Sequence, residues 1–187
     1  IKGWDSEAVR QWQATNNEFA VLTTYPHDFF VKNAYSENGG QMEGFEVPIL
    51  CRLGFAGSGH LKNLQALHVR NMPAPKLTSA WAAGFSFSKC HAEIQVMYDP
   101  HIPYIYDGEE ISRAARLWTS GYDFYTPTRA IVYHDYSKPG TVTRFVVDSE
   151  VEKKSNWRVF SLLNMTGNKY FRTFQDDIQE LAPSDST

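Results

Sequence analysis

Cysteine is scarce in this sequence: Cys51 and Cys90 are the only two among its 187 residues. They lie far apart and form no CxxC pair, so their spacing indicates neither a zinc site nor a disulfide framework. Free cysteine is among the residue types most often buried, and we therefore expect two buried, unpaired thiols.

Long apolar runs and an excess of positive charge are also missing. No segment approaches the roughly 20 consecutive apolar residues that a transmembrane helix needs, so no membrane span is predicted in this chain. Lysine and arginine number 18 against 21 acidic residues, which gives a net charge of −3 at pH 7. Because there is no basic stripe, nucleic acid is not expected to be a partner.

Aromatic residues are plentiful by contrast, with five Trp and ten Tyr in a chain of a length typical of one domain. Strands that alternate with helices predict an α/β fold with a mixed sheet. Helices are expected from a cap at Asp5 or Ser6 to about Asn17, at 90–97, and from about Glu109 to Ser120. Strands are expected at 19–25, within 48–63, at 64–72, 79–89 and 129–136, and a loop at 29–47.

Three carboxylates crowd the start of the third expected helix. Asp107, Glu109 and Glu110 directly follow the aromatic stretch Tyr104-Ile-Tyr106. Carboxylates in a first helical turn gain about 0.3–1 kcal/mol each from the helix dipole, which is one explanation for them. Asp107 lies outside the helix, however, and neighbouring carboxylates repel one another unless a cationic or hydroxyl-rich group lies between them. Carboxylates beside aromatic rings favour a sugar-binding loop, and a general base is a further alternative.

The rest of that helix has an apolar face made by Ile111, Ala114, Ala115 and Trp118, and Gly121 is expected to end it. Trp118 is predicted to belong to the core rather than to contact a ligand.

Several stretches in order resemble one family of transferases. "IKGWD", "AVLTTYP", "CRLGFAGSG", "WAAGFSFSK" and "YDPHIPYIYDGEEISRAARLWTSGYDFYTPTRAIVYHDY" are similar to the GlcNAc-transferase family that includes the hydroxyproline-polypeptide N-acetylglucosaminyltransferases. More distantly, the region 1–136 is similar to the mucin-type polypeptide GalNAc-transferases. The resemblance implies a glycosyltransferase-A-like fold, a mixed sheet flanked by helices, which uses a nucleotide sugar and a divalent metal.

The resemblance also implies roles for individual residues. Gly108-Glu109 matches the Gly-Glu pair that contacts the transferred sugar in this family, with Tyr106, Asp107 and Glu110 beside it. Trp81, Ala83 and Gly84 match a strand that lines the donor sugar, although small residues there are equally compatible with close strand packing. Arg116 matches the Arg of an Arg-x-Trp helix and is expected at the substrate site.

His134 matches a late histidine that ligates the metal in this family, and Asp135 and Tyr136 are expected to orient it. Manganese is favoured over magnesium because it accepts a nitrogen ligand more readily. The other histidines are expected to be surface or structural residues: His27, His60, His68, His91 and His101.

The family's Asp-x-His or Asp-x-Asp motif, which holds the metal and the donor diphosphate, is expected before the "IKGWD" segment, and we identify no counterpart of it in this chain. The chain is therefore expected to be the acceptor-side half of a transferase domain and to be inactive alone. We assign 1–152 to the catalytic domain and 153–187 to a polar helical tail.

Together these expectations describe a metal-dependent, retaining transferase. It would move a sugar, most simply GlcNAc, from a UDP-sugar to a hydroxyl of a protein acceptor (hydroxyproline, Ser or Thr) or of a glycan. The alternative is a non-catalytic carbohydrate-binding or structural fragment. Free thiols and the lack of a signal peptide in this sequence slightly favour the cytoplasm over the secretory pathway.

Overall fold

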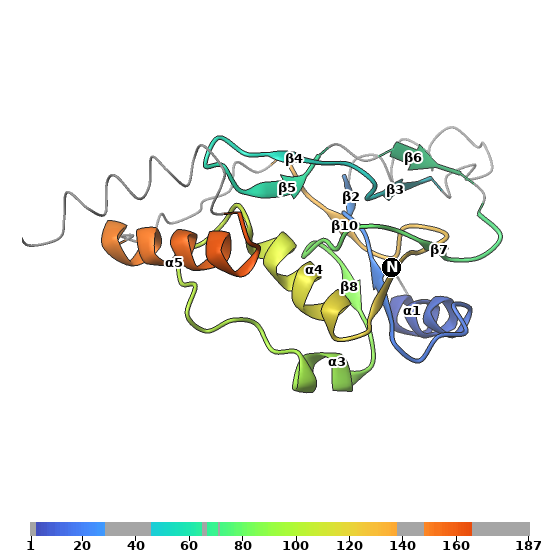
Figure 1. Ribbon diagram of the computed structural model, residues 1–187. Coiled ribbons are helices and arrows are strands. Elements are labelled where there is room, and N and C mark those ends of the chain that lie inside the picture. Colours follow the sequence, from blue (N-terminus) through green and yellow to red (C-terminus); the bar gives the residue numbers. More distant parts are fainter. Residues whose placement is uncertain (1–2, 29–45, 65–66, 71, 138–147, 166–187) are drawn as a thin grey trace, which may run out of the picture.

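A computed structural model describes residues 3–28, 46–64, 67–70, 72–137 and 148–165 (Figure 1). Within them the chain forms a mixed α/β fold with small sheets and four helices. The helices are α1 (Trp4–Gln13), α3 (Cys90–Gln95), α4 (Glu109–Thr119) and α5 (Ser149–Leu162). The α/β class is thus confirmed. The loop expected at 29–47 lies largely outside the described residues.

The largest sheet has four strands in the order β7-β9-β1-β8. They are β7 (Lys76–Leu77), β9 (Asp123–Thr126), β1 (Ala20–Thr23) and β8 (Ser86–Phe87). β1 pairs in parallel with β9, with Val21 opposite Phe124, whereas β7 and β8 pair antiparallel to their neighbours. All four residues of β1 are buried, as expected for a central strand.

Three strand pairs complete the described structure. They are β2 (His27–Asp28) with β10 (Tyr133–His134), β3 (Val47–Ile49) with β6 (Leu67–Val69), and β4 (Leu53–Phe55) with β5 (Leu61–Asn63). The last pair is a hairpin whose turn contains Gly59 at φ +84°. Such a positive φ is readily adopted by glycine.

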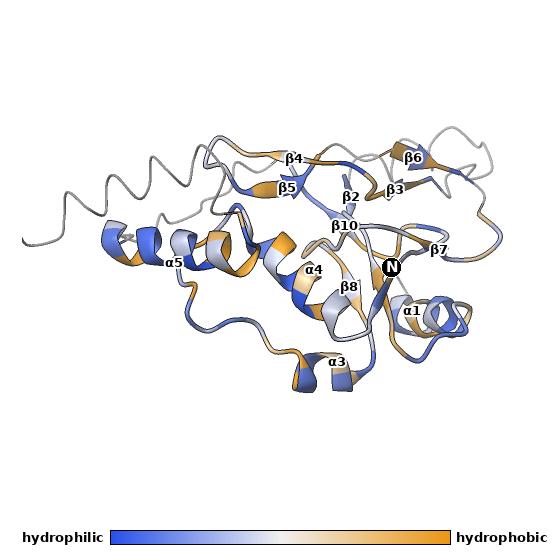
Figure 2. Cartoon of the chain, in the orientation of Figure 1, coloured by the Kyte–Doolittle hydropathy of each residue, from blue (hydrophilic) through white to orange (hydrophobic). Residues whose placement is uncertain are grey.

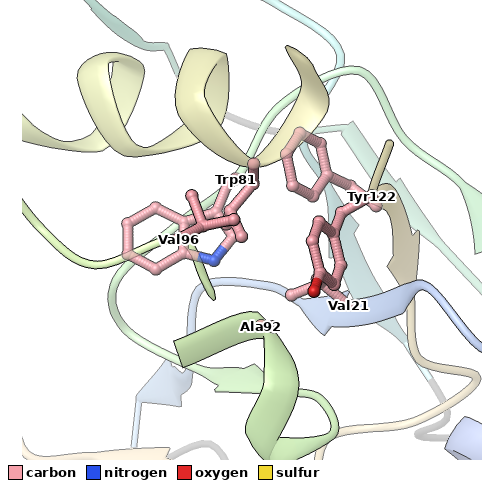
Figure 3. Close-up of a cluster of buried hydrophobic side chains, with 7 residues drawn as sticks. Val21, Trp81, Ala92, Val96 and Tyr122 are labelled. Carbon is pink, nitrogen blue, oxygen red and sulfur yellow. The ribbon is translucent and has the colours of Figure 1, made fainter. Parts of the chain in front are cut away.

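Helices cover both faces of the four-stranded sheet. Neighbouring residues of a strand point to opposite faces. Val21 accordingly packs with Leu117 of α4 and Ala92 of α3, whereas Leu22 packs with Ala8 of α1. Figure 3 shows part of the first cluster, where Trp81, Val96 and Tyr122 lie between α4 and α3. The C-terminal half of α4 is therefore anchored to the sheet through Leu117.

Helix α4 has the predicted bounds to within one residue, and Gly121 follows it at φ +90°, as predicted. The apolar face assigned to it is buried only in part: Ile111 is buried as expected and Ala114 packs against the core cluster. Leu117 is 1% exposed, but Trp118 is 69% exposed, so the prediction of a core Trp118 is wrong. Apolar and polar residues alternate around the helix (Figure 2). Ile111, Ala114, Ala115 and Trp118 also border an apolar groove with Leu53 and Leu77.

Other expectations need correction. Helix α1 is capped by Gly3, not by Asp5 or Ser6, and no side chain caps it. Both cysteines are free, as expected, but exposed rather than buried. The strand expected at 79–89 is regular only at Ser86–Phe87. In the stretch before it, the Ala82 N–H donates to a side chain, Thr23 Oγ1, at 2.9 Å, and not to a neighbouring strand.

Candidate functional site

A segment that precedes α4 brings the acidic residues to the helix mouth. It starts at Asp99, whose buried carboxylate accepts hydrogen bonds from Arg158 Nε at 2.8 Å and from the His101 N–H at 2.9 Å. It ends at Gly108, the N-cap of α4, at φ +97°. A Cβ atom at Gly108 would lie 2.8 Å from His60 Nδ1, so the turn into α4 requires glycine for both its dihedral angle and its space.

The acidic residues border a cavity of about 320 Å³. It lies among the end of β1, the hairpin strand β5, the stretch before β8 and the start of α4. Its lining residues are Tyr25, Leu61, Lys62, Asn63, Ala83, Tyr106, Asp107, Gly108, Glu109 and Glu110. Six of the ten residues predicted for the site therefore line the same cavity: Ala83, Tyr106, Asp107, Gly108, Glu109 and Glu110.

Glu110 is held by protein donors. Its Oε2 atom accepts hydrogen bonds from the Tyr25 hydroxyl at 2.5 Å and from Asn63 Nδ2 at 3.0 Å. Its Oε1 atom accepts from the Ala83 N–H at 2.9 Å. Burial, and then the hydrogen bond to the Glu110 carboxylate, raise the pKa of Tyr25 well above its ordinary value, so the tyrosine stays protonated and donates.

Glu109 differs from its neighbour. Within the part of the chain that the structure describes, no donor bonds its half-buried carboxylate, which faces the cavity. Burial, and then the charge of Glu110, raise the pKa of Glu109 above its ordinary value. A partly desolvated carboxylate without a donor is poised to accept hydrogen bonds from a ligand.

Asp107 and Tyr106 form the outer rim of the cavity. Ser58 Oγ, from the hairpin turn, donates to Asp107 Oδ2 at 3.2 Å. The Tyr106 side chain is 91% exposed, and its ring is therefore available to stack on a bound molecule. Tyr104 at φ +61° shows that the segment turns sharply just before these two residues.

The small-residue stretch contributes backbone rather than side chains. The ring of Trp81 is 2% exposed and lies in the core, where its Nε1 donates to Ser86 Oγ. Its carbonyl oxygen accepts from Asn63 Nδ2 at 2.8 Å, next to the cavity. A Cβ atom at Gly84 would lie 2.5 Å from Pro26 Cδ, so close packing accounts for this glycine.

Arg116 is absent from the residues that line the cavity, and its Nε donates to the Met97 carbonyl oxygen at 3.1 Å. One turn earlier, the buried Arg113 donates to the Val96 carbonyl, pairs with Glu93 and stacks on the Tyr98 ring at 4.5 Å. Both arginines thus hold the segment that leads to the acidic loop, and this role was not predicted.

His134 lies on β10, exposed, opposite Asp28 of β2 and with its ring 4.3 Å from that of Tyr136. The Tyr136 hydroxyl donates to the Pro26 carbonyl oxygen, and Pro26 packs against Gly84, the residue that follows the cavity-lining Ala83. Across the described ranges, no group of three or more His, Cys, Asp or Glu side chains could hold a metal ion. These residues therefore do not form a complete metal site around His134.

We expected no Asp-x-His motif in this chain, but one tripeptide of that form does occur, Asp99-Pro100-His101. Its carboxylate is engaged by Arg158 and by the backbone N–H of its own His101. It forms a turn rather than a pair of metal ligands.

Five residues at this site were not predicted to belong to it: the cavity-lining Tyr25, Leu61, Lys62 and Asn63, and His60 next to Gly108. Tyr25 lies two residues after β1 and Asn63 is the last residue of β5, so a polar residue at the end of a strand was the available signal. His60, expected to be a surface or structural histidine, is a structural one at 1% exposed. Its ring stacks on Phe160 of α5 at 4.1 Å, and its Nε2 pairs with Asn156 Oδ1 at 2.7 Å. Helix α5 therefore supports the floor of the site.

The fold and the cavity define an α/β protein with an acidic, tyrosine-bordered cavity at the start of α4. A family model described as Glycosyltransferase (GlcNAc) matches residues 1–184. The chain belongs to this glycosyltransferase family. The match confirms the resemblance seen in the sequence and continues past Tyr136 through α5.

Comparisons with curated proteins and with solved structures gave no match. In the described ranges, no helix has the length and apolar character needed to cross a membrane.

Proposed function

We propose that this protein is part of a hexosyltransferase that moves GlcNAc from UDP-GlcNAc to a hydroxyl of a protein (hydroxyproline, Ser or Thr) or of a glycan. The observation that carries the proposal is the cavity in which Glu109, to which no described residue donates a hydrogen bond, lies beside Glu110, Tyr25 and the exposed Tyr106. Family membership supports a transferase, and the cavity supplies groups suited to a sugar.

The two glutamates have different tasks in this proposal. Glu109 accepts hydrogen bonds from hydroxyls of the transferred sugar, and each such charge-assisted bond contributes about 1.5–3 kcal/mol. Glu110 is already bound by Tyr25, Asn63 and Ala83, so it shapes the pocket wall. Tyr106 would cover one face of the pyranose ring. Asp107, at the rim, would contact an outer hydroxyl or the incoming acceptor.

The reaction itself would proceed with retention of the anomeric configuration. The carboxylates orient the sugar and stabilise positive charge that develops at its anomeric carbon, and neither has to form a covalent bond. Placing the acceptor hydroxyl and the anomeric carbon in reach of each other is then the main contribution of the pocket.

The finer fold assignment is part of the same proposal. A mixed sheet with helices on both faces, and a sugar pocket at the mouth of α4, suit the acceptor-side half of a glycosyltransferase-A-like domain. The donor diphosphate would then lie mainly against residues outside those described.

A divalent cation, manganese in preference to magnesium, belongs to this proposal with His134 as one ligand. The remaining ligands would have to be the donor diphosphate and an acidic side chain outside the described residues. When bound, such a cation offsets charge on the departing nucleotide. His134→Ala should remove the Mn²⁺ dependence of UDP binding, measured by calorimetry with and without Mn²⁺. The matched control His101→Ala should keep it.

The decisive test of the sugar site is Glu109→Gln in the full-length protein, assayed for UDP-GlcNAc binding and for transfer to hydroxyproline- and serine-containing peptides. We expect transfer to fall at least tenfold with an unchanged melting temperature, because the amide keeps the shape and loses the charge. The control is Glu152→Gln, in the first turn of α5. If both variants lose only stability and keep full transfer, Glu109 serves the helix dipole. Sugar binding without any transfer would indicate a carbohydrate-binding module.

A further inference from the structure

Three segments that are distant in sequence converge on one carboxylate. The Tyr25 hydroxyl lies 2.5 Å from Glu110 Oε2, Asn63 Nδ2 lies 3.0 Å from the same atom, and the Ala83 N–H lies 2.9 Å from Oε1. Tyr25 follows β1, Asn63 ends β5, and Ala83 precedes β8. The Glu110 carboxylate thus connects three sides of the cavity.

Tyr25 has a distinct place in this group. Its hydroxyl donates its single proton to Glu110 and accepts from Asn63 Nδ2 at 3.3 Å. A hydroxyl–carboxylate bond of this length belongs to the strong, charge-assisted class. The other donor to Oε2, Asn63 Nδ2, is shared with the Trp81 carbonyl oxygen at 2.8 Å. Tyr25 is therefore the donor whose loss frees Oε2 most.

We propose that Tyr25 is a positioning residue of the sugar site. It fixes the Glu110 carboxylate and, through it, the wall of the cavity that the backbone at Ala83 forms. The proposal rests on the proposed function for its catalytic meaning but not for its structural content. With Phe at position 25, Oε2 keeps only the shared Asn63 donor, and the carboxylate can rotate about its terminal bond. The Ala83 N–H then loses a fixed acceptor, and the wall next to the sugar loosens.

The expected effect on the reaction is on binding more than on chemistry. Because Glu110 shapes the wall in the ground state and the transition state alike, Tyr25→Phe should raise the KM for UDP-GlcNAc about tenfold while kcat changes less than about twofold. Tyr125→Phe is the matched control. This variant also lacks a tyrosine hydroxyl, but in the described residues the Tyr125 hydroxyl accepts a hydrogen bond from Asn17 Nδ2 and does not contact Glu110. It should leave both constants unchanged.

A second measurement does not depend on activity. In the ¹⁵N-labelled full-length protein, the Ala83 amide proton should move upfield and exchange with solvent about tenfold faster in Tyr25→Phe than in the wild type. Tyr125→Phe should leave that resonance in place. If Tyr25→Phe does not fold, Glu110→Ala should produce the same change at Ala83, because it removes the acceptor oxygen of the Ala83 N–H.

If the chemical shift and the exchange rate of the Ala83 amide are unchanged in Tyr25→Phe, the proposal is overturned, whatever the affinity for UDP-GlcNAc. A changed amide with unchanged UDP-GlcNAc affinity also overturns it, because the wall would then not serve the site. If the wild type itself does not bind UDP-GlcNAc, the proposed function fails. The Ala83 amide still decides whether Tyr25 fixes Glu110.

Discussion

The imidazole of His60 lies against Gly108, the N-cap residue of helix α4: a Cβ atom on Gly108 would be 2.8 Å from His60 Nδ1. His60 in turn stacks on Phe160 and pairs with Asn156, both from α5. The position of the glutamates is therefore set from behind by a histidine and by a helix some 40 residues further along the chain.

Gly108→Ala should be markedly destabilising. The left-handed backbone costs an alanine about 1–2 kcal/mol, and the contact with His60 adds about 1–3 kcal/mol of overpacking. Gly121→Ala is the matched control, since Gly121 has φ +90° but open space around its Cβ position. Urea unfolding should show a loss of about 1–2 kcal/mol for Gly121→Ala and a clearly larger one for Gly108→Ala. Equal losses would mean that His60 yields to the new methyl group.

Stability should fall in mild acid because of His60. Burial lowers the pKa of His60 below its ordinary value of 6.5, against smaller opposing effects from Asn156 and Asp107. Below pH 6.5 the unfolded chain therefore binds this proton more readily than the folded chain does, so the free energy of unfolding decreases as the pH falls from there toward the lowered pKa. Well above pH 6.5 His60 is neutral in both the folded and the unfolded chain, so its titration no longer changes the free energy of unfolding.

The measurement is urea unfolding between pH 5 and 8 for the wild type and for His60→Gln, whose amide can still donate to Asn156. Other titrating groups are common to both proteins and cancel in the difference between them. The wild type should lose more stability than the variant over the acid part of the range. Parallel curves would show that His60 titrates alike in the folded and unfolded chains.

Two neighbouring residues of α4 should behave in opposite ways. Leu117 is 1% exposed and packs with Trp81 and Phe124, whereas Trp118 is 69% exposed. Leu117→Ala should cost about 2–5 kcal/mol in unfolding free energy, and Trp118→Ala less than about 1 kcal/mol despite its larger ring. A Trp118→Ala variant as unstable as Leu117→Ala would reveal a packing partner outside the described residues.

Helix α4 illustrates what the sequence could predict. Its acidic first turn, its stop at Gly121 and its length all depend on residues close in sequence, and its bounds were predicted to within one residue. Which side faces the core depends on the sheet beneath it, and this was predicted only in part: Ile111 is buried as expected, but Trp118 was assigned to the core in place of its neighbour Leu117. A wide apolar arc does not by itself identify the buried residues.

The stretch before β8 illustrates what could not be predicted from the sequence. Alanines and a glycine suggested a strand, but the backbone N–H groups of Ala82 and Ala83 bond to the side chains of Thr23 and Glu110, which lie 59 and 27 residues away. The same holds for Tyr25, which reaches Glu110 across 85 residues. The acidic cluster itself could be predicted from the sequence. The hydrogen-bond donors to Glu110, which distinguish it from Glu109, come from distant segments and are brought together only by the tertiary fold.

The ion pair between Arg158 and Asp99 should anchor the segment that leads to the acidic loop. Asp99 is almost fully buried, and although burial opposes it, the hydrogen bonds from Arg158 and the His101 N–H lower the pKa of this carboxyl. Arg158→Met keeps the apolar stem and removes the donor. Because the Arg158 side chain is 40% exposed, solvent screens the pair, and we expect a loss of about 1–2 kcal/mol.

Lys153→Met is the control, since it removes one cation of the same helix from a solvent-exposed pair with Glu150 and should cost at most about 0.5 kcal/mol. The pH dependence gives a second check. A lowered pKa stabilises the fold above the ordinary pKa of an aspartate, about 3.8, and the contribution is lost as the pH falls through the folded value. The difference between the wild type and Arg158→Met should therefore shrink below about pH 4. A difference that persists in strong acid would show that the loss does not come from the ion pair between Arg158 and Asp99.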